Sequence, residues 1–284
     1  MSKLPTLSIL ILLLLMTAII CIGCDEFDAN YEKSVRDNFL VDKIYDYNDN
    51  LLAEYFYDKN NRLTKRIVTK VDYHPLRITD WRLEDIFEYK NGRVSKIHFY
   101  MRTLDTYTES DFENLNESRY VINYEYDSKG NLKKCRDFSY RYEKGRVAGM
   151  SRNQNGPFCG PDTIVYDHSG NVCQHIYIGP EVNNLGEPIA GTSKRVVYHF
   201  EYDNNPKLNF GLDYLYSYQP LPHMETDVVG EMILSKNNMT KTDHGGYTWV
   251  YTYNENGLPA TIGALWNGKE TIERKYKITY KQIY

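Results

Sequence analysis

The sequence predicts an all-β fold, a large curved antiparallel meander sheet of successive hairpins. Three observations predict it. A short strand–turn–strand phrase recurs almost from end to end, and the chain holds 27 Tyr in 284 residues. After the start of the repeat, no Pro/Gly/Ser-rich linker marks a boundary between two domains. Tyrosine suits a pleated surface, because aromatic pairs across neighbouring strands add roughly 0.2–1 kcal/mol each.

The phrase is clearest at Tyr124-Glu-Tyr-Asp-Ser-Lys-Gly-Asn-Leu132. Tyr120, Ile122, Tyr124 and Tyr126 alternate with polar residues, which predicts a strand with one buried face. The segment 127–131 then supplies turn chemistry, since Asp and Asn side chains bond nearby backbone and Gly tolerates positive φ. Leu132 restarts the apolar face, so the phrase predicts a hairpin.

Copies of the phrase predict the remaining hairpins in chain order. They span residues 45–51, 57–63, 89–94, 142–147, 166–172, 202–208 and 253–258, and a final turn is expected at 266–269. The spacing varies, so this is a degenerate repeat without a strict period. Given common hairpin lengths, we expect roughly fourteen to eighteen strands.

Three stretches interrupt the repeat. Arg102–Ser118 is polar and acidic, and is expected to be a long hairpin loop. Gly179–Thr192 is rich in Pro and Gly, which are incompatible with continuous pairing, and is also expected to be a loop. Leu208–Val229 carries Pro220 and Pro222, and we expect a short helical turn near residues 212–216.

The first 23 residues predict a secretory signal. Lys3 gives the positive start, and residues 9–20 form an apolar core too short to be a spanning helix. Ile22-Gly23-Cys24 resembles the end of a bacterial lipobox, although Cys21 stands where Leu is usual. The resemblance implies cleavage before Cys24 and lipidation of its thiol. The alternative is an ordinary signal peptide with an incidental Cys.

These features predict three regions and a location. Residues 1–23 are the lipoprotein signal peptide, 24–35 a lipid-anchored polar tether, and 36–284 a single repeat-like β domain. Asp25 and Glu26 resemble the surface-export signal of lipoproteins in some gut Gram-negative bacteria. This resemblance implies an outer membrane lipoprotein on the outer leaflet.

A formal net charge of −4 argues against nucleic acid as a partner, because nucleic-acid binding requires a concentrated basic face.

Three cysteines follow the signal and Cys24, namely Cys135, Cys159 and Cys173. The predicted compartment permits a disulfide, but an odd number leaves at least one thiol over. Cys159 with Cys173 is the best candidate pair. The cysteine and histidine spacings do not suggest a metal site, and no cofactor motif is found.

Two family resemblances follow from these residues. The Tyr-Asp-x-x-Gly-x-Leu pattern resembles the YD repeats of RHS-type proteins. The order of segments 200–206, 234–238 and 251–259 is similar to a family of secreted bacterial lipoproteins of unknown function with a porin-like β fold, although Leu258 replaces the usual aromatic. This resemblance implies a sheet that is either open or closed into a barrel, and it supplies no catalytic or binding residue.

The strands do not have the pattern of membrane-spanning strands. Such a strand needs about 9–11 residues with one face free of charge. Lys133 and Lys134 follow Leu132, and Lys65 and Arg66 follow Leu63, which places charge on both strand faces.

No catalytic constellation is found, and we expect a protein that is not an enzyme. Asp243-His244 lacks a nucleophile, and Glu84-Asp85 would point to opposite strand faces. We therefore expect a non-catalytic binding or interaction module at the cell envelope, held to the membrane by its lipid anchor, with a glycan or protein partner. The alternatives are a structural envelope protein without a ligand, or a hydrolase of a surface polymer.

Overall fold

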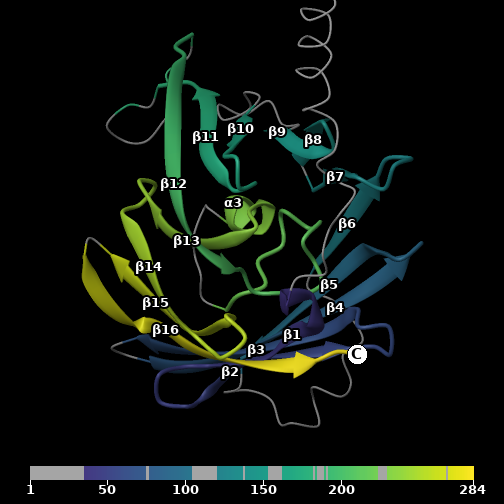
Figure 1. The fold of residues 1–284 in the computed structure, drawn as a ribbon, viewed down its shortest axis with the longest axis vertical. Coiled ribbons are helices and arrows are strands. Elements are labelled where there is room, and N and C mark those ends of the chain that lie inside the picture. Colours follow the sequence, from purple (N-terminus) through teal and green to yellow (C-terminus); the bar gives the residue numbers. More distant parts are fainter. Residues whose placement is uncertain are drawn as a thin grey trace, which may run out of the picture. The chain divides into compact units, whose positions relative to one another are not determined.

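Sixteen antiparallel strands form a single sheet in the described part of the chain (Figure 1). The computed structural model describes residues 35–74, 77–103, 120–136, 138–152, 162–181, 183, 189, 191–222, 229–266 and 268–284. The chain divides into the units Met1–Val35 and Arg36–Tyr284, and the sheet belongs to the second. None of the helices within the described ranges is long and apolar enough to cross a membrane.

The strands follow one another around the sheet almost in chain order. The spatial order runs from β10 through β16 to β1, and then from β1 through β9. The predicted meander and its expected strand number are therefore confirmed. The bounds are β1 Phe39–Tyr45, β2 Leu51–Tyr57, β3 Leu63–His74, β4 Arg77–Lys90, β5 Arg93–Thr103, β6 Tyr120–Tyr126, β7 Leu132–Cys135, β8 Phe138–Glu143, β9 Arg146–Arg152, β10 Thr163–Tyr166, β11 Val172–Gly179, β12 Lys194–Pro206, β13 Asn237–Thr242, β14 Tyr247–Tyr253, β15 Pro259–Trp266 and β16 Lys269–Gln282.

The sheet nearly closes on itself at its two edge strands, β9 and β10. The backbone N–H of Asp162, just before β10, donates to the carbonyl of Met150 on β9 at 2.9 Å. The Tyr166 hydroxyl donates to the Val147 carbonyl at 3.0 Å, and the Arg146 guanidinium lies 5.4 Å from the centre of the Tyr166 ring. These contacts cover edges that would otherwise present unpaired backbone groups.

The turns form as the phrase predicts, except at the copy 202–208, where β12 ends at Pro206 and the next strand, β13, begins only at Asn237. In the copy after β6, the Asp127 carboxylate accepts hydrogen bonds from the backbone N–H groups of Lys129 and Asn131, both at 2.8 Å. Gly130 takes a φ of 81°, which a residue without a Cβ adopts at little cost. The shorter copy between β4 and β5 turns through Asn91 and Gly92 with φ of 53° and 77°, the geometry of a two-residue hairpin.

Tyrosines near the ends of strands, most of them directly before a turn, link neighbouring repeats. In several hairpins the strand register shifts at such a tyrosine, for example between Glu88 and Tyr89. Such a bulge re-aims the side chain. Among the described residues, seven tyrosine hydroxyls donate to a carbonyl near the start of another strand, at 2.6–3.1 Å: Tyr57 to Val41, Tyr89 to Leu63, Tyr126 to Val94, Tyr142 to Leu132, Tyr166 to Val147, Tyr251 to Met239 and Tyr280 to Pro259. We call this set the tyrosine ladder.

The two faces of the sheet differ in polarity. Inward-facing positions are apolar and buried, as at Val94, Ile97 and Ile122. Outward-facing positions carry exposed ion pairs, such as Lys241–Glu201 at 2.8 Å. The inner face has charge too, because Arg66 of β3 points inward while its neighbour Lys65 pairs with Glu84 at 3.4 Å. The expectation of charge on both strand faces is thus confirmed at this position.

The interior is filled by the segment 207–222 and by helix α3, Val229–Leu234 (Figure 1). Leu212, Leu215 and Tyr218 of this segment are buried against the sheet. The expectation of a helical turn near residues 212–216 is wrong, because two consecutive tight turns take its place. The backbone N–H of Leu215 donates to the Leu212 carbonyl, and that of Tyr218 donates to the Leu215 carbonyl. Apolar side chains spaced along these turns contact different parts of the sheet, whereas a helix would present its apolar side chains along a single stripe.

A buried ion pair fixes the segment to β3 and β4. The Arg66 guanidinium lies 2.5 Å from the Asp85 carboxylate, and the Tyr218 hydroxyl donates to the same carboxylate at 2.7 Å. Arg66 also donates to the carbonyls of Gln219 and Pro220 at 2.6 and 2.9 Å. The pair therefore satisfies the backbone of an irregular segment that has no strand partner of its own.

We predict that Asp85→Ala lowers the free energy of unfolding by about 3–5 kcal/mol, because it leaves the Arg66 charge buried and uncompensated. Urea denaturation measures the loss. Glu201→Ala, which removes one partner of an exposed pair, is the control and should change stability little. A loss for Asp85→Ala no larger than that of the control would contradict the anchoring role.

Candidate functional site

A cavity of about 70 Å³ lies inside the sheet, between the segment 207–222, α3 and strands β13–β15. Its walls are mostly apolar, with Phe210, Leu212, Met239 and Ile262 among them. A cavity needs roughly 10–15 Å³ to hold one water, and each water takes about 30 Å³ in the liquid, so this cavity holds about two waters or a fragment of similar size. The space suits the end of a ligand better than a whole drug-sized molecule.

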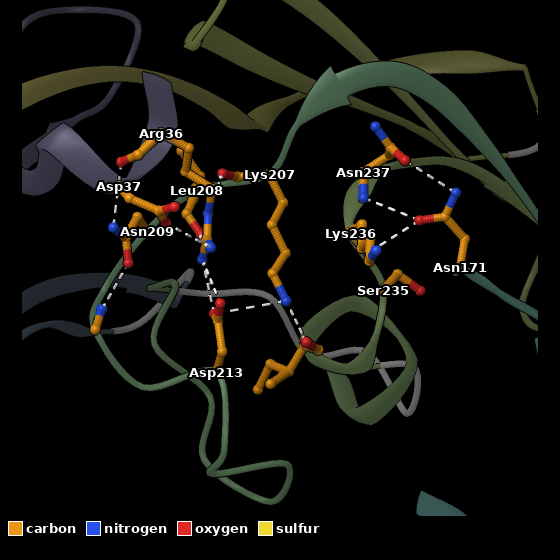
Figure 2. Close-up of polar contacts among 12 residues, drawn as sticks. Arg36, Asp37, Asn171, Lys207, Leu208, Asn209, Asp213, Ser235, Lys236 and Asn237 are labelled. Atoms are coloured by element: carbon orange, nitrogen blue, oxygen red, sulfur yellow. Dashed lines mark hydrogen bonds and ion pairs between the residues drawn. The ribbon is translucent and has the colours of Figure 1, made fainter. Parts of the chain in front are cut away.

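Charged side chains line one end of this cavity (Figure 2). The Lys207 ammonium lies 3.5 Å from the Asp213 carboxylate and donates to the carbonyl of Ile233 at the end of α3. Asp213 is also 2.7 Å from the Arg36 guanidinium. Arg36 in turn donates to the carbonyls of Lys207 and Leu208 at 3.0 and 3.3 Å, so it holds the first residues of the segment in place.

Burial sets the protonation of Lys207. Removal from water lowers the pKa of the Lys207 ammonium from 10.5 to about 8, although Asp213 acts in the opposite direction. The cations Lys207 and Arg36 lower the pKa of Asp213 even though its burial opposes this. Lys207 is therefore still largely protonated at neutral pH and presents an ammonium with three N–H donors. Its described contacts use two of them.

A second polar cluster surrounds Asn171 and includes Asn237 of the cavity wall (Figure 2). The amide oxygen of Asn171 accepts from the backbone N–H groups of Lys236 and Asn237, both at 2.9 Å. The Asn171 amide nitrogen donates to the Asn237 side-chain oxygen at 3.0 Å. These bonds tie the β10–β11 turn to the start of β13, so this cluster positions the wall of the cavity.

The chemistry of the cavity is set by one cation and by apolar walls. A single ammonium faces an apolar space, and the acidic group beside it is engaged by two cations. Among the described residues, no group of three or more His, Cys, Asp or Glu side chains could hold a metal ion. An apolar pocket with one charged donor can accommodate an aliphatic group that ends in an anion.

Comparison with known proteins gives a resemblance in structure only. No family model and no curated protein matches the chain. This chain is similar to porin-like proteins of Bacteroides. One solved structure, described as a porin-like protein from Bacteroides uniformis ATCC 8492, has 16% identity and a TM-score of 0.37, with 81% of this chain and 89% of that chain covered. Another, described as a porin-like protein from Bacteroides vulgatus ATCC 8482, has 14% identity and a TM-score of 0.36, with 86% and 100% covered. At these TM-scores the similarity carries no argument about activity.

The cysteines singled out from the sequence are only partly described. Cys24 and Cys159 lie outside the described residues, so the lipidation and the Cys159–Cys173 pairing stay predictions. Cys173 lies on β11, where its thiol approaches the Val165 carbonyl at 3.5 Å. Cys135 is buried and carries a free thiol, which accepts a hydrogen bond from Ser217 at 3.1 Å.

The acidic and histidine candidates have separate structural partners. Asp85 faces the interior and Glu84 faces Arg82 and Lys65, so the two carboxylates do not form a pair. Asp243 bonds His199 at 2.9 Å instead of its neighbour His244. His244 stacks on the Tyr198 ring, with the ring centres 4.3 Å apart.

Lys207 and Arg36 are site residues that the sequence did not predict. Lys207 lies within a copy of the turn phrase, 202–208, where a lysine is ordinary turn composition. The available signal was Pro206, which ends strand pairing and directs the chain away from the sheet at that point. Arg36 precedes β1 in the short 3-10 helix Val35–Asn38, and its contact with residues 207–213 depends on long-range folding.

A buried histidine ties α3 to the closure of the sheet. His175 of β11 lies 2.5 Å from the Glu231 carboxylate of α3 and 3.2 Å from that of Asp162, next to β10. Burial alone would lower the pKa of His175, but the hydrogen bonds to Asp162 and Glu231 outweigh it and raise the pKa from 6.5 to about 9. The imidazolium therefore bridges two carboxylates at neutral pH.

This pKa gives a pH dependence with a defined sign. Because the pKa of His175 is higher in the folded state than in the unfolded state, its contacts contribute stability that is fully present below pH 6.5. This contribution is lost as the pH rises towards 9. We predict that unfolding free energy falls by on the order of 3 kcal/mol between pH 6 and pH 9.5 through this group. In His175→Gln, denaturant titrations should show a flatter profile over that interval. An unchanged profile would contradict the bridging role.

Proposed function

We propose that this chain is a non-catalytic, lipid-anchored binding module of the cell envelope, whose cavity takes a short aliphatic carboxylate or the carboxylate-bearing end of a larger molecule. The observation that carries the proposal is the Lys207 ammonium in the wall of an otherwise largely apolar cavity of about 70 Å³. A buried lysine with a lowered pKa is retained against a cost in stability, which is a feature of functional sites.

The size and chemistry of the cavity define the ligand. A cavity of 150 Å³ holds benzene, which has six non-hydrogen atoms, so this space corresponds to about three or four non-hydrogen atoms. Its aliphatic part would contact Met239 and Ile262, and its carboxylate would accept the N–H of Lys207 that the described contacts leave unused. A neutral head group would lack the charge-assisted part of this bond.

The location rests on the sequence. The proposed path is cleavage before Cys24, lipidation of its thiol, and display on the outer leaflet directed by Asp25 and Glu26. The polar tether 24–35 then leads to the β domain. The charged outer face of the sheet, with pairs such as Lys43–Glu54 at 2.9 Å, supports a domain that is surrounded by water.

We predict that acetate binds to the full chain in detergent and that acetamide, equal in size but neutral, binds at least tenfold more weakly. Isothermal titration calorimetry measures both. Lys207→Met should lower acetate affinity about 10- to 100-fold, because a hydrogen bond to a charged group is worth about 1.5–3 kcal/mol. Lys59→Met, on an exposed turn, is the matched control. Equal binding of acetate and acetamide would contradict the role of Lys207, and no binding of either would favour a structural envelope protein.

The anchor has its own test. Cys24→Ser, expressed in a Gram-negative host fed a labelled fatty acid, should lose the label and leave the membrane fraction. Cys21→Ser should keep both, because the lipobox places modification at Cys24. Retention of the label in Cys24→Ser would refute the proposed attachment point.

A further inference from the structure

An arginine without an acidic partner lies at the edge of the sheet that carries the hairpin turns 58–62, 91–92 and 127–131. Because neighbouring strands are antiparallel, β2, β4 and β6 all end at this edge. Arg93 is the first residue of β5, directly after the second turn, and its side chain is half-buried. Among the described residues its guanidinium has no hydrogen-bond or ion-pair partner, and its contacts are with aromatic rings.

Two tyrosine rings hold the Arg93 guanidinium. It lies 4.9 Å from the centre of the Tyr214 ring and 5.7 Å from that of Tyr126, over electron-rich faces that attract a cation. Both rings are fixed to the residue next to Arg93. The Tyr126 hydroxyl donates to the Val94 carbonyl at 2.7 Å, and the Val94 N–H donates to the Tyr214 hydroxyl oxygen at 3.2 Å. The guanidinium is therefore positioned before any ligand arrives.

The Tyr214 hydroxyl supplies a second donor beside Arg93. Its oxygen accepts from Val94, but its own hydrogen has no acceptor among the described residues. Burial raises the pKa of Tyr214, although the nearby Arg93 and Arg62 charges oppose the rise, so the hydroxyl keeps its proton at neutral pH. Guanidinium N–H groups and one O–H are thus available at the same place.

Gly130 of the turn 127–131 leaves room for the guanidinium. A Cβ at this position would lie 3.0 Å from the Arg93 Nε atom and 3.3 Å from one of its terminal nitrogens. The turn itself requires glycine as well, since its φ is 81°. The residue that closes one hairpin therefore also gives space to the arginine of the preceding hairpin.

The surrounding turns carry an excess of positive charge. Residues 58–62, 90–93 and 127–131 hold five basic and two acidic residues. The Asp58 carboxylate lies 2.6 Å from the Arg62 guanidinium. The Asp127 carboxylate accepts from the side-chain amide of Asn131 at 3.0 Å and from two backbone N–H groups of its own turn. Both acidic groups are therefore engaged by residues other than Arg93.

These donors match a phosphate group better than a carboxylate. The guanidinium of an arginine binds two oxygens of an anion through parallel N–H groups. A carboxylate has only these two oxygens, whereas a phosphate has a third that can accept from the Tyr214 hydroxyl.

We propose that Arg93 and Tyr214 bind the phosphate group of a phosphate monoester, either free or in a lipid head group. Neither residue lines the interior cavity, so this site is independent of the function proposed above.

The test titrates the full chain in detergent with glycerol 3-phosphate and with glycerate, which carries a carboxylate in place of the phosphate. Calorimetry should give a Kd for glycerol 3-phosphate below about 1 mM and at least fivefold weaker binding of glycerate. Arg93→Gln should lower the affinity for the phosphate about 10- to 100-fold, and Tyr214→Phe, which keeps the ring, about two- to tenfold. Arg93→Lys should recover only part of the loss, because an ammonium lacks the parallel N–H groups.

Lys144→Gln is the charge-matched control, since it removes an exposed charge from the turn after β8 at the same edge, and it should leave binding unchanged. Lys207→Met should also leave it unchanged. The proposal is overturned if glycerol 3-phosphate does not bind, if glycerate binds equally well, or if Lys207→Met abolishes binding and Arg93→Gln does not. It is also overturned if Arg93→Gln lowers the melting temperature without weakening phosphate binding, because Arg93 is then only structural.

The source of the phosphate is distinguished by the full chain reconstituted in phosphatidylcholine vesicles with and without phosphatidic acid. If a lipid head group occupies the site, phosphatidic acid lowers the apparent affinity for glycerol 3-phosphate in the parent chain and has no such effect in Arg93→Gln. If the ligand is a free ester, the affinity is the same in both kinds of vesicle.

Discussion

Tyrosine hydroxyls donate to carbonyls of other repeats, and the sheet depends on these bonds. Backbone pairing joins each strand to its neighbours, but the tyrosine ladder ties β2, β4, β6, β8, β10, β14 and β16 to residues near the start of another strand. Burial raises the pKa of Tyr57, Tyr126 and Tyr142, so these hydroxyls remain protonated and donate over the whole physiological range. At the seam, where strand pairing stops, Tyr166 makes the same bond from β10 to β9.

A sheet that curves almost into a closed barrel encloses an interior, and this interior must be filled. The chain fills it with its own segment 207–222 and with α3. An irregular segment cannot pair its backbone as a strand does, so its carbonyls are satisfied by inward charges, Arg66 on one side and Arg36 on the other. The cavity at Lys207 lies where this filling is incomplete. The interior site is therefore a consequence of how the sheet is packed.

The hairpins could be predicted from the sequence because they are local. Alternating Tyr and a turn of Asp, Asn and Gly specify strand, turn and face within about nine residues. The structure has these elements at the copies of the phrase except 202–208, where β12 is not followed by a returning strand. The interior segment could not be predicted in the same way. Its proline residues exclude strand, but its path is decided by contacts with residues more than 100 positions away, such as Tyr218 with Asp85. Lys207 and Arg36 were missed for the same reason.

The interior cavity is enclosed by the curved sheet, whose repeats the ladder holds together. The most direct measurement is the free energy of unfolding across a cumulative series in which Tyr57, Tyr89, Tyr126, Tyr142 and Tyr166 are changed to Phe one after another. Each lost bond should cost about 1 kcal/mol, so the full series should lose on the order of 5 kcal/mol, a large part of the stability of an ordinary domain. A total loss below about 1 kcal/mol would show that the hydroxyl bonds do not hold the repeats together.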